Sequence, residues 1–173
     1  VRRPLAATEY VITNLDPVYE MLWIKIDQCN HVTFVGAIYH PPKPVYQTVN
    51  LLDRIEEEII RMQQNFPGSH VVLAGDLNTM PDSEIVIRTG MRSMVTQPTR
   101  GSSYLDRVYV SDLDYDGIKV VVSAVKSDHR AIVAHNGVVL KALNKPRRTC
   151  TFRKHTSAQH ARFLVGVQQH KRS

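Results

Sequence analysis

The sequence predicts an α/β fold, and three observations support this prediction. Residues 21–26 and 32–39 are two β-type apolar runs separated by a turn-like break, which is typical of an antiparallel hairpin. Residues 48–66 place apolar side chains at spacings of three and four, as an amphipathic helix does. Val71–Ala74 is an apolar run that predicts a buried strand. A strand, a crossover helix and another strand in succession indicate an α/β sheet.

The composition is that of a globular protein without a membrane span. The 173 residues are enough for one domain with a core; 43% are hydrophobic and 22% are charged. No apolar run approaches the ~20 residues of a membrane span, and residues 1–4 lack a signal-peptide apolar region. The two cysteines form no metal or disulfide pattern, which favours a reducing, intracellular compartment. Because the first residue is not methionine, we expect a fragment of a longer reading frame or a trimmed chain.

Charge divides the chain unevenly. Residues 1–128 hold 12 Lys and Arg against all 16 Asp and Glu, a net charge of −4, whereas residues 129–173 hold 10 Lys and Arg and no acid. This asymmetry predicts a basic tail that binds a polyanion. A solvated basic linker explains the same composition equally well.

Breaks in the pattern place the elements of the first half. Residues 9–14 predict a strand, followed by a turn at Asp16-Pro17. The strand 32–39 ends at Tyr39-His40-Pro41-Pro42, where two prolines enforce an extended exit. Thr48 is the expected cap of the helix and Pro67-Gly68 its end. Its apolar stripe consists of Leu52, Ile55, Ile59, Met62 and Phe66.

Shorter elements follow in the second half. Asp82 or Ser83 is expected to cap a short helix over residues 84–89 that Gly90 stops. Residues 104–110 alternate, which places Asp106 on one face of a strand with Val108 and Val110. We further expect a loop at 97–101, an acidic turn at 112–117, strands at 118–125, 131–134 and 138–143, a linker at 144–148 and a weak helix at 158–167. The domain is therefore placed at residues 1–143 and a basic tail at 144–173.

Asp76 and Asn78 directly follow the buried strand 71–74. In extended backbone, residues two apart point to the same side, so a carboxylate and a carboxamide would face one pocket. Strand ends of α/β sheets commonly display catalytic groups. Taken alone, however, the pair is better explained by an Asx-type turn.

Four polar clusters share this placement at strand ends, and together they suit metal-assisted phosphodiester hydrolysis. They are Tyr39-His40, Asp76 with Asn78, Asp106, and Ser127-Asp128-His129. Carboxylates and an amide can bind Mg²⁺, a histidine with a carboxylate partner can act near neutral pH, and tyrosine and asparagine can donate hydrogen bonds to phosphoryl oxygens. The set lacks the activated nucleophile of acyl transfer, and the sequence has no Walker loop or dinucleotide fingerprint.

Each of these residues also has a purely structural explanation. Tyr39 can be a half-buried aromatic residue, and Asp106 can form a surface ion pair with Arg107. Ser127-Asp128 can shape a turn, and His129 can be a structural histidine. All four explanations would have to hold together at one sheet edge, which favours the functional interpretation.

The ordered motifs resemble the endonuclease/exonuclease/phosphatase superfamily. They are Gly36-Ala-Ile-Tyr-His-Pro-Pro42, Leu73-Ala-Gly-Asp-Leu-Asn78, Leu105-Asp106 and Ser127-Asp-His129. Each motif is weak by itself, and the combination is specific. The resemblance covers residues 21–134 and implies two packed, mostly antiparallel sheets flanked by helices.

Within this superfamily, the sequence is most similar to endonuclease domains of non-LTR retrotransposon polyproteins. The similarity lies in the Tyr39-His-Pro-Pro42 hairpin end, the Pro98-Thr-Arg-Gly101 loop and the Leu105–Ser111 strand. The basic stretch Thr151–His155 resembles the connector to a reverse transcriptase in such elements. The resemblance implies DNA as substrate, a reverse transcriptase domain farther along the parent protein and a nuclear location.

The resemblance also implies a role for each matching residue. Asp76 would orient or deprotonate the attacking water, while Asn78 and Tyr39 would contact the phosphoryl group. Arg100, in the Pro98–Gly101 loop, would bind substrate. His129 would stabilise charge on the scissile phosphate.

Two further matching residues would support this chemistry. Asp106 would orient His129, and Asp128 would help at the metal, Mg²⁺ or Mn²⁺, or support the histidine.

One departure from the family pattern is important. The family also uses an asparagine and a metal-binding glutamate well before the Tyr39 motif, and only 38 residues precede Tyr39. Glu9 and Glu20 are the glutamates there, and neither lies in the family's sequence context. We therefore expect the C-terminal part of a domain with one incomplete sheet, weak Mg²⁺ binding and poor DNA nicking.

Three functions remain in competition. The first is the DNA-nicking endonuclease of a retroelement. The second is a superfamily enzyme that acts on a phospholipid or inositol phosphate. The third is a nucleic-acid-binding remnant without catalysis, whose binding would weaken steeply with salt.

Overall fold

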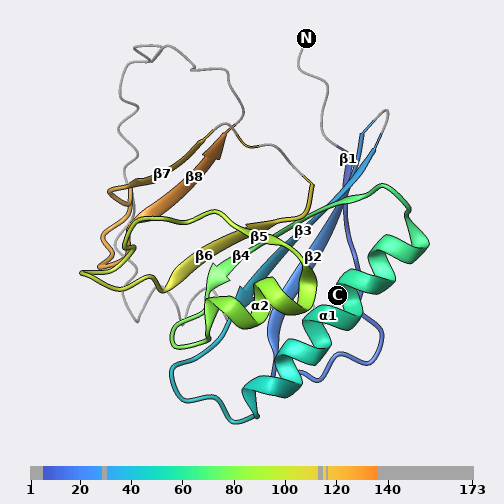
Figure 1. The fold of residues 1–173 in the computed structure, drawn as a ribbon, viewed down its shortest axis with the longest axis horizontal. Helices are drawn as coiled ribbons and strands as arrows, with labels where there is room; N and C mark the ends of the chain where they lie inside the picture. Colours follow the sequence, from blue (N-terminus) through green and yellow to red (C-terminus); the bar gives the residue numbers. More distant parts are fainter. Residues whose placement is uncertain (1–5, 29–30, 113–114, 116, 136–173) are drawn as a thin grey trace, which may run out of the picture. The chain divides into compact units, whose positions relative to one another are not determined.

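A computed structural model describes residues 6–28, 31–112, 115 and 117–135 (Figure 1), all within one compact unit, Val1–Val138. The expected elements beyond residue 135, and the expected domain boundary at residue 143, lie outside the described residues. In chain order the elements are β1 (Ala6–Glu9), β2 (Glu20–Asp27), β3 (Val32–Tyr39), α1 (Thr48–Asn65), β4 (His70–Asp76), α2 (Asp82–Thr89), β5 (Arg92–Ser93), β6 (Asp106–Val110), β7 (Gly117–Val121) and β8 (Ala131–His135). No helix in the described part of the chain is both long and apolar enough to cross a membrane.

The strands form two sheets. The larger sheet has six strands in the order β1-β2-β3-β4-β6-β5, and the smaller sheet pairs β7 with β8. Only β3 and β4 run parallel among the described strand pairs, because α1 forms the crossover between them. The other pairs are antiparallel. The predicted α/β class with mostly antiparallel sheets is confirmed.

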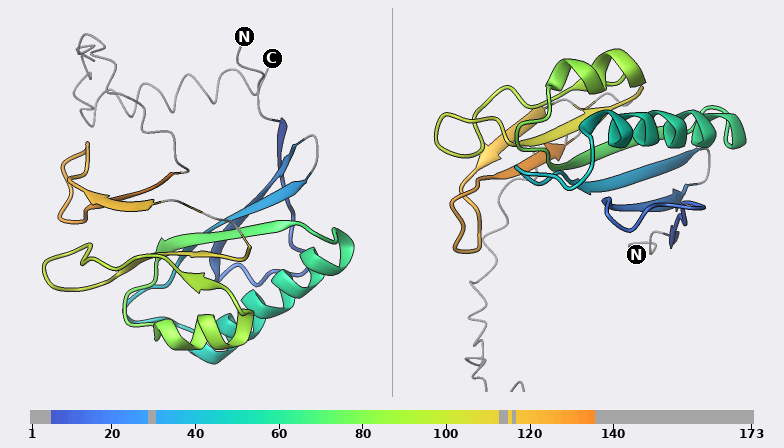
Figure 2. Two further views of the ribbon diagram at one scale, coloured as in Figure 1. Left: turned by 45° about the horizontal axis from the view of Figure 1, so that its top comes forward. Right: turned by 90° about the horizontal axis from the view of Figure 1, so that it is seen from below.

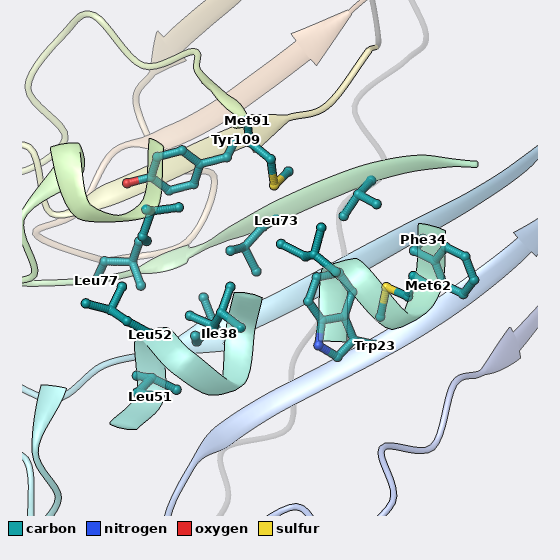
Figure 3. Packing of buried hydrophobic residues seen from close by; sticks show 14 of the residues in the cluster. Trp23, Phe34, Ile38, Leu51, Leu52, Met62, Leu73, Leu77, Met91 and Tyr109 are labelled. Atoms are coloured by element: carbon teal, nitrogen blue, oxygen red, sulfur yellow. The ribbon is translucent and has the colours of Figure 1, made fainter. Parts of the chain in front are cut away.

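Both helices cover one face of the six-stranded sheet (Figure 2). The predicted stripe of α1 supplies buried Leu52, Ile55, Ile59 and Met62, and strand residues such as Phe34 face it. Figure 3 shows this core between helix and sheet. The burial of apolar side chains in this core accounts for the periodicity of residues 48–66, because every third or fourth residue of α1 faces the sheet.

Trp23 is the largest side chain of this core and depends on a glycine opposite it. Trp23 and Gly36 are paired across β2 and β3, and a Cβ atom built on Gly36 would lie 2.6 Å from the indole ring. The ring is 1% exposed. The missing side chain of Gly36 thus provides the space that the indole occupies.

The small sheet packs against the opposite face of the large one. Val72, Val108 and Val110 form a second buried cluster, to which Ile118 of β7 and Ile132 of β8 add partly buried side chains. The alternation predicted for residues 104–110 explains this, because Val108 and Val110 face this cluster while Tyr109 faces the helices.

Three predicted details of the strands and of helix α1 are wrong. The first strand is Ala6–Glu9 and not residues 9–14, since the chain leaves the ladder and Asn14 adopts a positive φ of 58°. Thr48 is the first residue of α1, and Gln47 occupies the cap position without a side-chain bond. The strand predicted at 118–125 ends at Val121. Residues 122–125 are mostly exposed, so their β-branched side chains lack the packing that stabilises a strand.

The start of α2 also differs from the prediction. Pro81 occupies the cap position without a side-chain hydrogen bond, and Asp82 is the first residue of the helix. The carboxylate of Asp82 instead accepts hydrogen bonds from the Tyr109 hydroxyl at 2.8 Å and from Ser93 at 3.1 Å. Gly90 ends the helix with φ 67°, as predicted, because the left-handed conformation suits glycine.

Candidate active site

Three polar residues form one row across the edge of the large sheet. Tyr39 is in register with Asp76 across the parallel pair β3 and β4, and Asp76 is in register with Asp106 across β4 and β6. Residues in register on neighbouring strands lie about 4.8 Å apart and share a face. That face is the one covered by the small sheet, because Asp106 has the same parity as Val108 and Val110. The row therefore joins three residues that are far apart in the sequence.

His129 reaches this row from the loop between β7 and β8. Its Nδ1 atom lies 2.8 Å from Oδ2 of Asp106, and both side chains are 23% exposed. Ligand atoms of Asp76, Asp106 and His129 all lie within 4.8 Å of one another. The Ser127 hydroxyl accepts a hydrogen bond from the His129 amide, so the turn explanation of Ser127 also holds. The predicted placement of these residues at one edge is therefore present in the structure.

The contact between Asp106 and His129 determines how the ring can act. An ionised carboxylate only accepts hydrogen bonds, so Nδ1 carries the proton that it donates to Asp106. Nε2 is then the ring atom left to meet a substrate. In the protonated ring both nitrogens donate, and a phosphoryl oxygen is a suitable acceptor for Nε2.

Asn78 takes a different position from the one that its spacing suggested. The extended backbone ends before it, since Asn78 has a φ of 44° in a turn. Its amide donates to Oδ1 of Asp76 at 3.2 Å, which is the Asx-type turn considered from sequence. Its side-chain Nδ2 donates to the His40 carbonyl at 2.8 Å. The turn thus holds the Asp76 carboxylate and ties Asn78 to the end of β3.

His40 anchors the loop that follows β3. Its side chain is 1% exposed, and Nδ1 lies 3.0 Å from the Tyr46 hydroxyl. Its amide donates to the Asp76 carbonyl at 2.9 Å. Burial lowers the pKa of the His40 imidazole, because the charged form loses hydration. A neutral, buried His40 therefore braces the ends of β3 and β4 beside Tyr39 and Asp76.

Arg100 and Asp128, predicted for substrate and metal, contact each other. Nη2 of Arg100 lies 2.6 Å from Oδ2 of Asp128, and the side chains are 51% and 65% exposed. Asp128 is absent from the group of ligand atoms formed by Asp76, Asp106 and His129. An exposed pair of this kind contributes only about 0–1 kcal/mol. The pair nevertheless links the loop after β5 to the loop that carries His129.

Two residues near the row carried no functional prediction from sequence. Glu20 is in register with Tyr39 across β2 and β3, and both line a hollow of about 350 Å³. The sequence could have identified Glu20, because the predicted strands 21–26 and 32–39 nearly match β2 and β3. Pairing them as a hairpin places Glu20 opposite Tyr39. Thr99 is completely buried beside Asp106; it lies in the Pro98–Gly101 motif, but only Arg100 of that motif was given a role from sequence.

The donor set fits a hard divalent cation. Asp76 and Asp106 offer carboxylate oxygens within a short distance of each other, and Mg²⁺ and Mn²⁺ prefer such oxygen ligands and keep several waters. No glutamate belongs to the groups of metal-ligating side chains found among the described residues. Two carboxylates are a small protein contribution to such a site, and the expected weak binding stays a prediction.

Two sheets pack face to face, carboxylates lie at the strand ends, and a histidine reaches them from a loop. This arrangement defines a class of protein suited to hydrolytic chemistry. Residues 1–129 match the model of the Endonuclease/Exonuclease/phosphatase family. The chain belongs to this family, which confirms the resemblance stated from its motifs.

Solved structures support the fold. The endonuclease domain of TRAS1, a telomere-specific non-LTR retrotransposon, is 18% identical with a TM-score of 0.55, covering 75% of this chain and 66% of that domain. Caenorhabditis elegans TDP2 is 15% identical with a TM-score of 0.52, covering 75% and 48%. A Staphylococcus aureus beta toxin mutant with bound magnesium ions is 13% identical with a TM-score of 0.50, covering 69% and 58%. The chain thus spans less than two thirds of these proteins, and no curated protein sequence matches it significantly.

Proposed function

We propose that this chain carries the Asp76, Asp106 and His129 site of a metal-dependent phosphodiesterase that nicks DNA. The observation that carries the proposal is the Asp106–His129 hydrogen bond of 2.8 Å, together with the group in which one ligand atom each of Asp76, Asp106 and His129 lies within 4.8 Å of the others. The histidine, oriented by Asp106, can stabilise the negative charge on the phosphate. The second carboxylate, that of Asp76, can orient and deprotonate the attacking water.

The residues divide the work as follows. Asp76, held by the Asn78 amide, orients the attacking water and accepts its proton. His129 donates from Nε2 to a phosphoryl oxygen, and Asp106 fixes the ring through Nδ1. The hydroxyl of Tyr39, a residue that is 38% exposed at the end of β3, donates a hydrogen bond to the phosphate.

A Mg²⁺ or Mn²⁺ ion would be held by the carboxylates of Asp76 and Asp106, with Asp128 able to assist only if it leaves Arg100. The ion would supply positive charge against the phosphoryl oxygens. Bound magnesium in the beta toxin structure supports this assignment.

Three features favour DNA as the substrate. One structural neighbour is a retrotransposon endonuclease domain. The segment 129–173 has ten basic and no acidic residues, which suits a polyanion. The motifs at Tyr39–Pro42 and Pro98–Gly101 resemble retroelement endonucleases. A parent protein that continues into a reverse transcriptase and acts in the nucleus is part of the same proposal.

Plasmid nicking by the full 173-residue chain tests the proposal. We expect slow conversion of supercoiled to open-circular DNA in Mg²⁺ or Mn²⁺, which Asp76→Asn and His129→Ala abolish. Asp112→Asn is the matched control, because Asp112 lies just beyond the opposite end of β6. Slow nicking that persists in Asp76→Asn would contradict the proposal. Robust Mg²⁺-dependent nicking lost on Asp76→Ala would instead overturn the expectation of an incomplete site.

Two other outcomes identify the competing functions. Salt-sensitive DNA binding without cleavage in any divalent ion indicates a binding remnant. Hydrolysis of inositol phosphates or phospholipids without DNA nicking indicates the lipid-directed alternative.

A further inference from the structure

Thr99 is a buried polar residue in the loop between β5 and β6. Its side chain is 0% exposed. Oγ1 accepts hydrogen bonds from the amide of Leu105 at 3.2 Å and from the amide of Asp106 at 3.0 Å. One hydroxyl therefore fixes the backbone at the first residue of β6, the residue whose carboxylate contacts His129.

The backbone of Thr99 reaches the other member of that contact. Its carbonyl accepts the amide hydrogen of Arg130 at 2.7 Å, and its own amide donates to the Ser103 carbonyl at 2.9 Å. Arg130 directly follows His129. Thr99 is thus bonded on one side to Asp106 and on the other to the neighbour of His129.

Few other polar contacts join the same two segments. In the described part of the chain, loop 126–130 meets residues 99–106 through Arg130 and Thr99, through His129 and Asp106, and through Asp128 and Arg100. The ion pair is exposed, so water competes with it. The Thr99–Arg130 bond is made by a buried residue, and buried hydrogen bonds hold geometry more tightly.

We propose that Thr99 is a positioning residue that sets the separation of Asp106 and His129. The inference rests on the proposed function for its catalytic meaning, but its geometric content is independent of activity. Loss of the Oγ1 acceptor leaves two amides without their partner, and the start of β6 must shift to satisfy them. Such a shift changes the Asp106–His129 contact, since Asp106 is the residue displaced.

Histidine ring NMR of the full chain tests this proposal. Two-bond ¹H–¹⁵N spectra report the tautomer and hydrogen bonding of His129, assigned with His129→Gln, and Asp106→Ala defines the signal of the unpaired ring. We expect Thr99→Val to move the His129 signal toward that of Asp106→Ala. Thr99→Ser keeps the hydroxyl and should restore the wild-type signal. Thr96→Val is the matched control, since Thr96 is exposed in the same segment.

The outcomes separate this inference from the proposed function. A wild-type His129 signal in folded Thr99→Val would overturn the inference, whether or not the chain nicks DNA. If Thr99→Val fails to fold, Thr99→Ala, which lacks the acceptor without a new branched side chain, takes its place with the same expectation. Where nicking is measurable, displacement of about 1 Å predicts a roughly 10²-fold lower rate at saturating DNA with unchanged DNA affinity. A nicking rate of Thr99→Val equal to that of the wild type would contradict the inference.

Discussion

Replacing Gly75 by alanine should damage both the sheet and the candidate site. A Cβ atom built on Gly75 would lie 1.8 Å from the Ile38 carbonyl oxygen, and real Cβ contacts are essentially never below 3.0 Å. The obstacle is backbone, so no side-chain rotation relieves it. Strands β3 and β4 must therefore separate at the Ile38–Gly75 pair, which directly precedes the Tyr39–Asp76 pair.

The expected cost follows from the distances. A gap wider by about 1 Å breaks the His40–Asp76 backbone bond, which is 2.9 Å long, together with its neighbour in the ladder. Each hydrogen bond is worth about 1 kcal/mol, and overpacking adds about 1–3 kcal/mol. A total of about 3–5 kcal/mol corresponds to a Tm decrease of roughly 10 °C for a chain of this size.

Thermal unfolding of the Gly75→Ala variant, followed by circular dichroism, measures this loss. Gly68→Ala is the control, because nothing lies within 4 Å of its Cβ position and only its φ of 77° disfavours alanine. That control should lose about 1–2 kcal/mol from the left-handed conformation. A Tm of Gly75→Ala within 2 °C of the wild type, or above that of Gly68→Ala, would refute the reasoning.

Three further predictions concern stability. Burial lowers the pKa of His40 below its usual value of about 6.5. The contribution of neutral His40 to the free energy of unfolding is therefore complete above about pH 6.5 and is lost as the pH falls through the lowered pKa. Urea midpoints should therefore decline less between pH 7 and pH 5 in His40→Asn than in the wild type; equal slopes would contradict this. Glu58→Ala should cost about 2–4 kcal/mol in urea unfolding, because this buried carboxylate meets two arginines, whereas the exposed Glu57→Ala should cost under about 1 kcal/mol. Trp23→Ala should cost about 3–5 kcal/mol and Leu22→Ala, 51% exposed, clearly less by the same measurement; similar losses would refute the assignment of the core face.

The fold was predictable where periodicity is strong. Residues 48–66 carry a helical stripe because α1 has one buried face, and the strand 32–39 matches β3. The first strand was misplaced, because residues 9–14 have β-type composition while the ladder with β2 is made by Ala6–Glu9. Strand pairing depends on partners distant in sequence, so local composition does not determine where a strand begins.

The candidate site was predicted in part. Asp76, Asp106 and His129 were grouped from sequence, and their ligand atoms lie within 4.8 Å of one another. Asn78 and Asp128 were assigned to the same site; Asn78 bonds to the His40 carbonyl and Asp128 to Arg100, and their roles toward phosphate and metal stay predictions. Side-chain direction in turns follows from local φ values and nearby partners, which spacing alone does not specify.

By itself, the sequence determined the α/β class, the amphipathic helix and the residue types at the strand ends, because periodicity and turn chemistry are local properties. Only the tertiary structure decided that Tyr39, Asp76 and Asp106 share one row, since that row depends on the register of three strands. It also decided that Thr99 joins Asp106 to the segment after His129. The Pro98–Gly101 motif marked this loop, but it did not show the role of the Thr99 hydroxyl, because that role arises from backbone amides brought together by folding.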